Sequence, residues 1–258
     1  MGKVIVIANQ KGGVGKTTTS INLSACLANK NKKTLTIDID PQGNASSGLG
    51  INTKDLDKTV YELLLGEASI DECTTKTVVK KLSLVPSNIN LTGAEIELLD
   101  MPDKEHLLKK GIAEVRDKYD FIIIDCPPSL NILTLNALTA ADQVIVPVQC
   151  EYYALEGLTQ LIYTINLVKK SLNPDLSIAG LVFTMFDSRT NLSQDVVDNV
   201  KENVQQYIYK TIIPRNIRLA EAPSYGLPII MYDPKSSGAH AYKKLAKEVI
   251  AQNKKKIF

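Results

Sequence analysis

The sequence predicts an α/β fold: a doubly wound, mostly parallel sheet with helices on both faces. Short runs rich in Val and Ile alternate with segments whose apolar residues recur at helical spacing, as right-handed β-α-β crossovers require. The first run, Lys3–Ala8, leads directly into a glycine-rich turn. Ligands of such sheets bind beyond the carboxyl ends of the strands, so the residues after each strand are the candidates for function.

Eight apolar runs are predicted to be strands. They are Lys3–Ala8, Thr34–Ile39, Leu82–Pro86, Phe121–Asp125, Val144–Val148, Ile178–Thr184, Lys210–Ile213 and Ile229–Met231. Helices are predicted after the first turn and around residues 158–168 and 242–249, where apolar residues follow a 3.6-residue period. The segment Gly43–Gly50 is predicted to be a loop. Without a repeat or a long linker, residues 1–258 are predicted to form one domain.

Composition indicates an ordinary globular protein, with 44% hydrophobic and 22% charged residues. No apolar stretch is long enough to cross a bilayer, and the amino terminus lacks the features of a signal peptide, so we expect a cytoplasmic protein. The cysteines have no C-x-x-C spacing, which argues against a zinc knuckle or a disulfide framework. They are Cys26, Cys73, Cys126 and Cys150. The isolated His106 and His240 are expected to have surface or packing roles.

Charge is unevenly distributed along the chain. The formal net charge is only +2, yet residues 201–258 hold eleven Lys and Arg against four Asp and Glu. A basic carboxyl-terminal fifth on a nearly neutral protein indicates an anionic partner there.

Residues 11–18 form a predicted phosphate cradle. Glycines allow a tight turn whose N–H groups point at phosphate oxygens, and the following helix adds its positive end. Lys16 is expected to reach the β- and γ-phosphates, and the Thr17 hydroxyl to ligate Mg²⁺. The predicted nucleotide contacts are Lys11, Gly12, Gly13, Val14, Gly15, Lys16, Thr17 and Thr18. Gln10 stands where an ordinary P-loop has glycine, and Lys11 adds a second lysine. A glycine turn that binds nothing is the disfavoured alternative.

Three carboxylates follow predicted strands. Asp38 and Asp40 lie two residues apart, which places them on the same side of a strand. Asp40 is predicted to orient the attacking water and Asp38 to support Mg²⁺ through water. The alternative is that Asp40-Pro41 only begins a turn and Asp38 caps the next segment. Asp125 ends an apolar strand in a pattern that resembles Walker B, which holds Mg²⁺ beside the cradle. The predicted catalytic residues are therefore Lys11, Lys16 and Asp40, and the predicted metal site is Thr17, Asp38 and Asp125.

The glycine loop and the two carboxylate segments together resemble those of the deviant Walker A ATPases and, more closely, those of the ParA/Soj chromosome- and plasmid-partitioning proteins. The resemblance covers nearly the whole chain. It runs through residues 11–19, 38–44, 93–98, 123–130, 147–158, 212–216 and 219–224.

The resemblance implies a slow ATPase that uses ATP and Mg²⁺ and forms a homodimer while ATP is bound. Lys11 would cross to the ATP of the other subunit. Pro214, Arg215 and Asn216 would lie near the adenine, with Pro214 packed on the base. The implied partners are non-specific double-stranded DNA and a ParB/Spo0J-type centromere-binding protein, and the implied location is the nucleoid.

Basic side chains toward the carboxyl end are candidates for DNA contacts. They are Arg189, Lys201, Arg215, Arg218, Lys235, Lys243, Lys244 and Lys247. The resemblance favours Arg189 and Arg218, whereas a solvated helix face remains an alternative for each lysine. Aromatic residues are few, at 5%, and no helix-turn-helix pattern stands out, so binding should be to phosphates and depend on salt.

Two other classes of ATPase remain open. A MinD-like membrane ATPase ends in an amphipathic helix, but here only Ile257 and Phe258 follow three lysines, which is too little apolar surface for an anchor. No membrane partner is therefore expected. A small-molecule ligase or kinase on the same scaffold is the second alternative; a nitrogenase-type iron protein is disfavoured because the cluster-ligating cysteine pair is absent.

Overall fold

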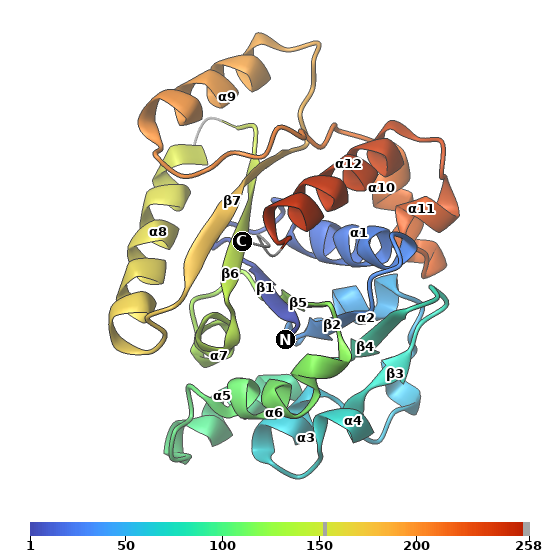
Figure 1. Cartoon of the computed structure of the whole chain (residues 1–258), viewed down its shortest axis with the longest axis vertical. Coiled ribbons are helices and arrows are strands. Elements are labelled where there is room, and N and C mark those ends of the chain that lie inside the picture. The colour runs from blue at the N-terminus through green and yellow to red at the C-terminus, as the bar shows by residue number, and fades with distance from the viewer. Residues whose placement is uncertain (152–153, 255–258) are drawn as a thin grey trace.

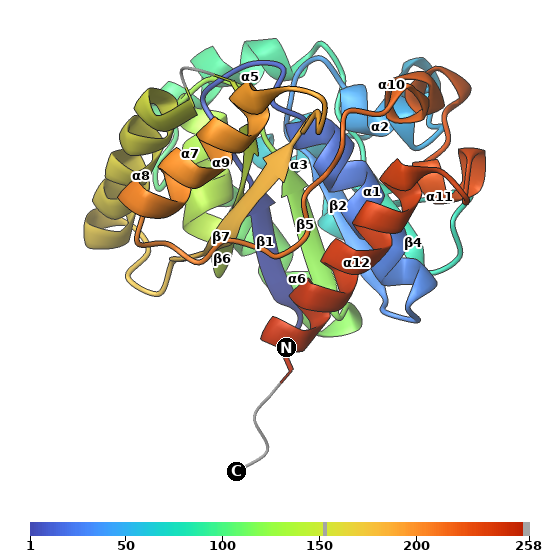
Figure 2. The ribbon, with the colours of Figure 1, turned by 90° about the horizontal axis from the view of Figure 1, so that it is seen from above.

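The computed structural model describes residues 1–151 and 154–254, and its centre is a seven-stranded sheet in the order β3-β4-β2-β5-β1-β6-β7 (Figures 1 and 2). The strands are β1 (Lys3–Ile7), β2 (Thr34–Asp38), β3 (Thr75–Lys76), β4 (Leu82–Val85), β5 (Phe121–Asp125), β6 (Gln143–Gln149) and β7 (Ser177–Thr184). Every neighbouring pair is parallel except β3 with β4. The predicted fold class is confirmed.

Helices cover both faces of the sheet. One face carries α1 (Lys16–Asn29) and α12 (Ser237–Gln252), with α2 (Asn44–Gly48), α10 (Ile217–Glu221) and α11 (Ile229–Tyr232) beside them (Figure 2). The other carries α3 (Val60–Leu65), α4 (Ile70–Cys73), α5 (Leu91–Glu97), α6 (Leu107–Val115), α7 (Ile132–Ala140) and α8 (Ala154–Ser171). Helix α9 (Asn191–Asn203) packs beside α8 at the β7 edge. The predicted helices around residues 17–23, 158–168 and 242–249 are confirmed as parts of α1, α8 and α12.

Alternate residues of β1 pack into two different hydrophobic cores, one on each face of the sheet. Val4 and Val6 pack with the α6–α8 side, whereas Ile5 and Ile7 pack with α1 and α12. All four side chains are fully buried. A strand buried on both faces reads as a continuous apolar run, which is why the sequence identified it. This packing fixes the carboxyl ends of β1, β2 and β5 at one edge.

The predicted strand Lys210–Ile213 is wrong. The N–H groups of Lys210 and Thr211 donate to the carboxylate of Glu248 at 2.9 Å each, so they do not join a strand ladder. Around this segment, isolated bridges tie Ile208 to β7 and Pro214 to Phe186. Residues 204–216, which we call the strap, therefore run as irregular chain between β7 and α12.

Two further predictions of local structure are wrong. Ile229–Met231 forms helix α11: Pro228 precedes it, and the Ile229 N–H donates to Asn22 Oδ1 at 2.7 Å. The segment Gly43–Gly50 contains helix α2, which begins after Gly43 in the left-handed region (φ 61°). Short strands and short helices give similar apolar runs, so tertiary contacts decided both.

Several smaller expectations can be placed. All four cysteines are free and buried. No helix among the described residues is long and apolar enough to span a bilayer. Residues 152–153 of the 147–158 box, and the tail residues Ile257 and Phe258, lie outside the described residues.

Candidate functional site

The glycine turn joins β1 to α1 and presents an open helix terminus. Gly13 and Gly15 have φ values of 75° and 86°, which side chains rarely adopt. Gly15 caps α1 without any side-chain hydrogen bond, so the N–H groups of the first turn are left for a ligand. A Cβ on Gly12 or Gly13 would meet nothing within 4 Å. The loop is thus a cradle with space in front of it.

Lys16 lies inside this cradle. Its side chain is buried, and Nζ donates to the Lys11 carbonyl at 3.0 Å, which ties the front of the loop to its back. Burial lowers the pKa of the Lys16 ammonium, and the negative charge of Asp125 acts in the opposite direction. A phosphate in the cradle would supply further negative charge and favour the protonated lysine.

Asp38 and Asp125 lie side by side at the ends of β2 and β5, where they are register partners, and both are fully buried. Ser46 of α2 donates to Asp38 Oδ2 through its N–H at 2.8 Å and its hydroxyl at 2.7 Å. Ser20 donates to Asp125 Oδ1 at 2.7 Å, but Asp125 Oδ2 is buried without a hydrogen-bond partner among the described residues. That oxygen therefore lacks its donor or cation.

Burial raises the pKa of both carboxyl groups, and their mutual repulsion raises the pKa of Asp125 further. The hydrogen bond from Ser20 and the nearby Thr17 hydroxyl lower the pKa of Asp125, which places the Thr17 side chain next to this carboxyl group. A cation here would remove the repulsion. Mg²⁺ typically takes one or two protein ligands, substrate phosphates and waters, so Thr17 with these two carboxylates fits its chemistry.

Asp40 stands just beyond the end of β2. Its Oδ1 accepts from the Gln42 N–H at 2.9 Å, and its carbonyl accepts from the Gly43 N–H, so it does begin a turn. Among the described residues Oδ2 makes no hydrogen bond, which leaves one oxygen for a water. The turn and the predicted water-orienting role are therefore compatible.

Lys11 does not point into its own cradle. Nζ forms an ion pair with Glu151 Oε2 at 2.8 Å, just beyond the end of β6, and both side chains are partly exposed. The Lys11 N–H donates to Asn9 Oδ1 at 3.0 Å, and Asn9 is itself held by the Pro147 carbonyl. The backbone of Lys11 belongs to the loop, whereas its ammonium is directed to the neighbouring strand end.

A pocket of about 480 Å³ adjoins the cradle on the α12 side. Its lining includes the three predicted base-binding residues, one glycine of the loop and one residue of the first turn of α1. These are Gly15, Thr18, Pro214, Arg215 and Asn216. The structure therefore brings the strap to the phosphate cradle, across about 200 residues of sequence.

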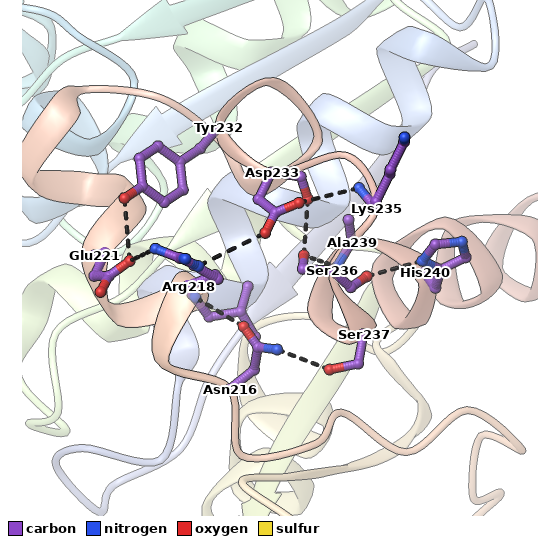
Figure 3. A network of polar contacts seen from close by, with 11 residues as sticks. Asn216, Arg218, Glu221, Tyr232, Asp233, Lys235, Ser236, Ser237, Ala239 and His240 are labelled. Atoms are coloured by element: carbon purple, nitrogen blue, oxygen red, sulfur yellow. Dashed lines mark hydrogen bonds and ion pairs between the residues drawn. The ribbon is translucent and has the colours of Figure 1, made fainter.

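The side chain of Asn216 is occupied within the chain. Oδ1 accepts from the Leu219 N–H at 3.3 Å at the start of α10, and Nδ2 donates to Ser237 Oγ at 2.7 Å (Figure 3). These bonds tie the start of α10 to α12, and the contact of Asn216 with the base stays a prediction.

Sequence reasoning missed two residues of this pocket. The Thr184 hydroxyl donates to the Val14 carbonyl at 2.8 Å and so ties β7 to the loop. Met185 follows with a φ of 53°, a strained conformation for a non-glycine residue that often marks a site. Their position at the end of a predicted strand was the available signal.

The basic candidates are scattered rather than gathered into one patch. Arg189 and Arg215 line the pocket of about 480 Å³ next to the cradle, Lys201 lies on α9, and Arg218 lies on α10. Lys235 precedes α12, which carries Lys243, Lys244 and Lys247. Lys243 lines a different pocket from Lys244 and Lys247.

Comparison with known proteins gives a consistent result over the whole chain. The AAA domain family matches residues 2–178. The sporulation initiation inhibitor protein Soj of Bacillus subtilis (strain 168) is 57% identical over 97% of this chain and 99% of its own length. The chromosome-partitioning ATPase Soj of Treponema pallidum (strain Nichols) is 55% identical over 98% and 99%.

The fold of this chain is also similar to that of a solved structure. Cobyrinic acid a,c-diamide synthase from Mycobacterium smegmatis, with bound ADP and magnesium, superposes with a TM-score of 0.87 at 39% identity. The match covers 97% of this chain and 94% of that one.

Proposed function

The chain belongs to the family of Soj and ParA chromosome-partitioning ATPases, and we propose that it is an ATP-driven switch for DNA partitioning. Mg-ATP drives two copies together and favours binding to DNA without sequence preference. Hydrolysis, stimulated by a ParB/Spo0J-type partner, releases the DNA. The same proposal treats residues 1–258 as one ATPase domain in the cytoplasm, associated with the nucleoid.

One observation carries the ATPase part of this proposal. Asp125 Oδ2, which has no hydrogen-bond partner in the described part of the chain, is buried at the edge of an open glycine cradle, beside its register partner Asp38. Two adjacent buried carboxylates are costly unless a cation joins them. Mg²⁺, held by Thr17 and through water by Asp38 and Asp125, would supply that charge and neutralise the phosphates.

In this mechanism each residue has a distinct task. The loop N–H groups and Lys16 hold the phosphates, and Asp40 orients a water in line with the γ-phosphorus. Lys11 leaves Glu151 and reaches the phosphates held by the second copy. Because the bond exists only while the γ-phosphate does, ATP acts as a clamp between the subunits. No strong general base adjoins the water in this account, so turnover is slow.

The test measures ATP hydrolysis and dimerisation of the same protein. Phosphate release should require Mg²⁺, and sedimentation velocity should show a dimer with ATP and a monomer with ADP. A wild-type chain that stays monomeric when saturated with ATP would contradict the switch. DNA and the ParB-type partner together should raise the hydrolysis rate.

A metabolic ligase is the alternative that one observation favours, since a diamide synthase superposes at 39% identity. The Soj relative is more similar, at 57% over 97% of the chain, and this supports partitioning. Stimulation of hydrolysis by DNA separates the two, because a small-molecule ligase should not respond to it.

A further inference from the structure

The two arginines that the resemblance favours for DNA contacts are already paired with carboxylates. Arg218 Nη1 lies 2.8 Å from Glu221 Oε2, and its Nε lies 3.7 Å from Asp233 Oδ2 (Figure 3). Arg189 Nη2 lies 2.6 Å from Asp187 Oδ2. A DNA phosphate would have to compete with these carboxylates for each guanidinium.

The lysines that are predicted to contact DNA differ in whether they have a partner within the chain. Lys201 lies 3.7 Å from Asp198, and Lys243 Nζ donates to the Pro234 carbonyl at 2.9 Å. Lys244 and Lys247 form no ion pair within residues 1–151 and 154–254, and both are exposed. Their positive charge is therefore uncompensated by a direct partner in that part of the chain.

Lys244 and Lys247 line a groove of about 740 Å³ between α12 and the strap. Lys210 of the strap lines it too, and so brings a third lysine to it. Glu248 also lines the groove, but both of its carboxylate oxygens accept N–H groups of the strap, at Lys210 and Thr211. That contact holds the strap against α12 and fixes the backbone of Lys210. The floor is apolar, with Phe186, Ile212, Pro214 and Ala241.

A second groove continues the basic surface toward the amino-terminal edge of the sheet. It has about 360 Å³ and is lined by Lys30, Lys32 and Lys254, together with Lys247. Lys247 thus lines both grooves, which lie side by side at this lysine. Asp120 lies 3.6 Å from Lys32 and partly compensates its charge. We call the remaining lysines the basic track: Lys30, Lys210, Lys244, Lys247 and Lys254.

We propose that the basic track is the surface along which the backbone of duplex DNA lies, a proposal that rests on the function proposed above and gives its DNA site. Lys244 and the last residue of α12, Gln252, are eight residues apart, which corresponds to about 12 Å along the helix, and Lys254 lies beyond that end. Duplex DNA carries one charge per about 1.7 Å of its axis, so a track of this length meets several phosphates. A small anion would meet only one or two of these lysines, so their number and their spread over two grooves favour a linear polyanion.

The groove also adjoins the candidate nucleotide site. Pro214 lines both the groove and the pocket of about 480 Å³ next to the cradle, so the strap is their common wall. A ligand in the groove can shift the strap and so change nucleotide binding in the pocket, and a nucleotide can act on the groove in the same way. The strap therefore gives DNA and nucleotide a direct physical connection.

The experiment is a titration of a fluorescent 40-base-pair duplex of arbitrary sequence with the full chain and Mg-ATP, read by anisotropy at several salt concentrations. The track variant is Lys210→Gln/Lys244→Gln/Lys247→Gln. Its charge-matched control is Lys54→Gln/Lys109→Gln/Lys169→Gln, three exposed lysines that lie away from the track and form no ion pair within the described residues. Thermal unfolding of both variants checks that they fold.

We expect the track variant to bind about a hundredfold more weakly near 0.1 M salt. The slope of log K against log salt should fall in magnitude by about 0.9 for each lost phosphate contact. The control should bind like the wild type. A second readout needs no variant: DNA should protect Lys210, Lys244 and Lys247 from acetylation, but not Lys243.

The outcomes separate the two proposals. Wild-type affinity and slope in the track variant, with DNA binding intact in the wild type, would overturn the track and leave the proposed function standing. A wild type that does not retain DNA at all would overturn both. Binding of the wild type to phosphatidylglycerol vesicles, lost in the track variant while DNA binding persists, would assign the track to a membrane and overturn the proposal.

Discussion

The ammonium of Lys11 lies 2.8 Å from the carboxylate of Glu151, so the second lysine of the loop is paired within its own chain. In the proposed dimer the same ammonium meets the phosphates of the other subunit. Glu151 and the second ATP therefore compete for one positive charge.

Replacing Glu151 with Gln should strengthen the ATP-bound dimer, because Lys11 no longer leaves a partner when it crosses. Partly exposed ion pairs contribute about 0.2–1 kcal/mol each and the dimer breaks two of them, so the dimer constant should improve by up to about thirtyfold. Sedimentation of a dilution series with ATP measures this. An unchanged or weaker dimer would argue that Glu151 does not hold Lys11 back.

Lys11→Ala should retain nucleotide binding and lose ATP-dependent dimerisation, since the cradle keeps Lys16 but loses the charge that reaches across. Fluorescent-nucleotide binding and light scattering provide the two readings. A stable ATP dimer of this variant would remove Lys11 from the interface.

Asp40→Ala should trap the ATP dimer, because the water would no longer be oriented while phosphate contacts persist. Loss of a positioning group of this kind typically lowers the rate by 10²-fold or more. Phosphate release and dimer lifetime should change together. Asp57→Ala, at an exposed carboxylate, is the control, and turnover equal to it would exclude Asp40 from the mechanism.

Metal-free protein should lose stability as pH rises. The folded-state pKa of Asp125 is raised by burial and by repulsion from Asp38, so the folded chain binds this proton more tightly than the unfolded chain does. The stabilisation is complete below the ordinary carboxyl pKa of about 4 and is lost as pH rises through the raised value. The Tm should fall by roughly 2–4 °C per pH unit across that range.

The comparison that isolates this effect is Asp125→Asn, which removes the titratable carboxyl group and should make the profile shallower, leaving the contribution of Asp38. Mg-ATP should restore the wild-type Tm near pH 8 by neutralising the pair. Parallel profiles of the wild type and Asp125→Asn would show that the pair does not titrate in this range.

The sequence by itself determined the candidate nucleotide site. Parallel strands bring their carboxyl ends to one edge, so Asp38, Asp125 and the loop after Ile7 had to meet once β1, β2 and β5 were recognised. The glycine positions were also readable, because only particular residues adopt the required backbone. Local pattern and sheet topology carry this information together.

Only the tertiary structure decided which charges are paired and which segments are strands. The pairing of the strap with β7 is interrupted at Lys210 and Thr211 because Glu248, 37 residues beyond Thr211, accepts the N–H groups of those two residues. Arg218 and Lys247 look alike in sequence, yet carboxylates surround the first, while the second joins Lys210 and Lys30 across two grooves. Ion pairs and grooves depend on contacts between distant segments, and no short-range period encodes them.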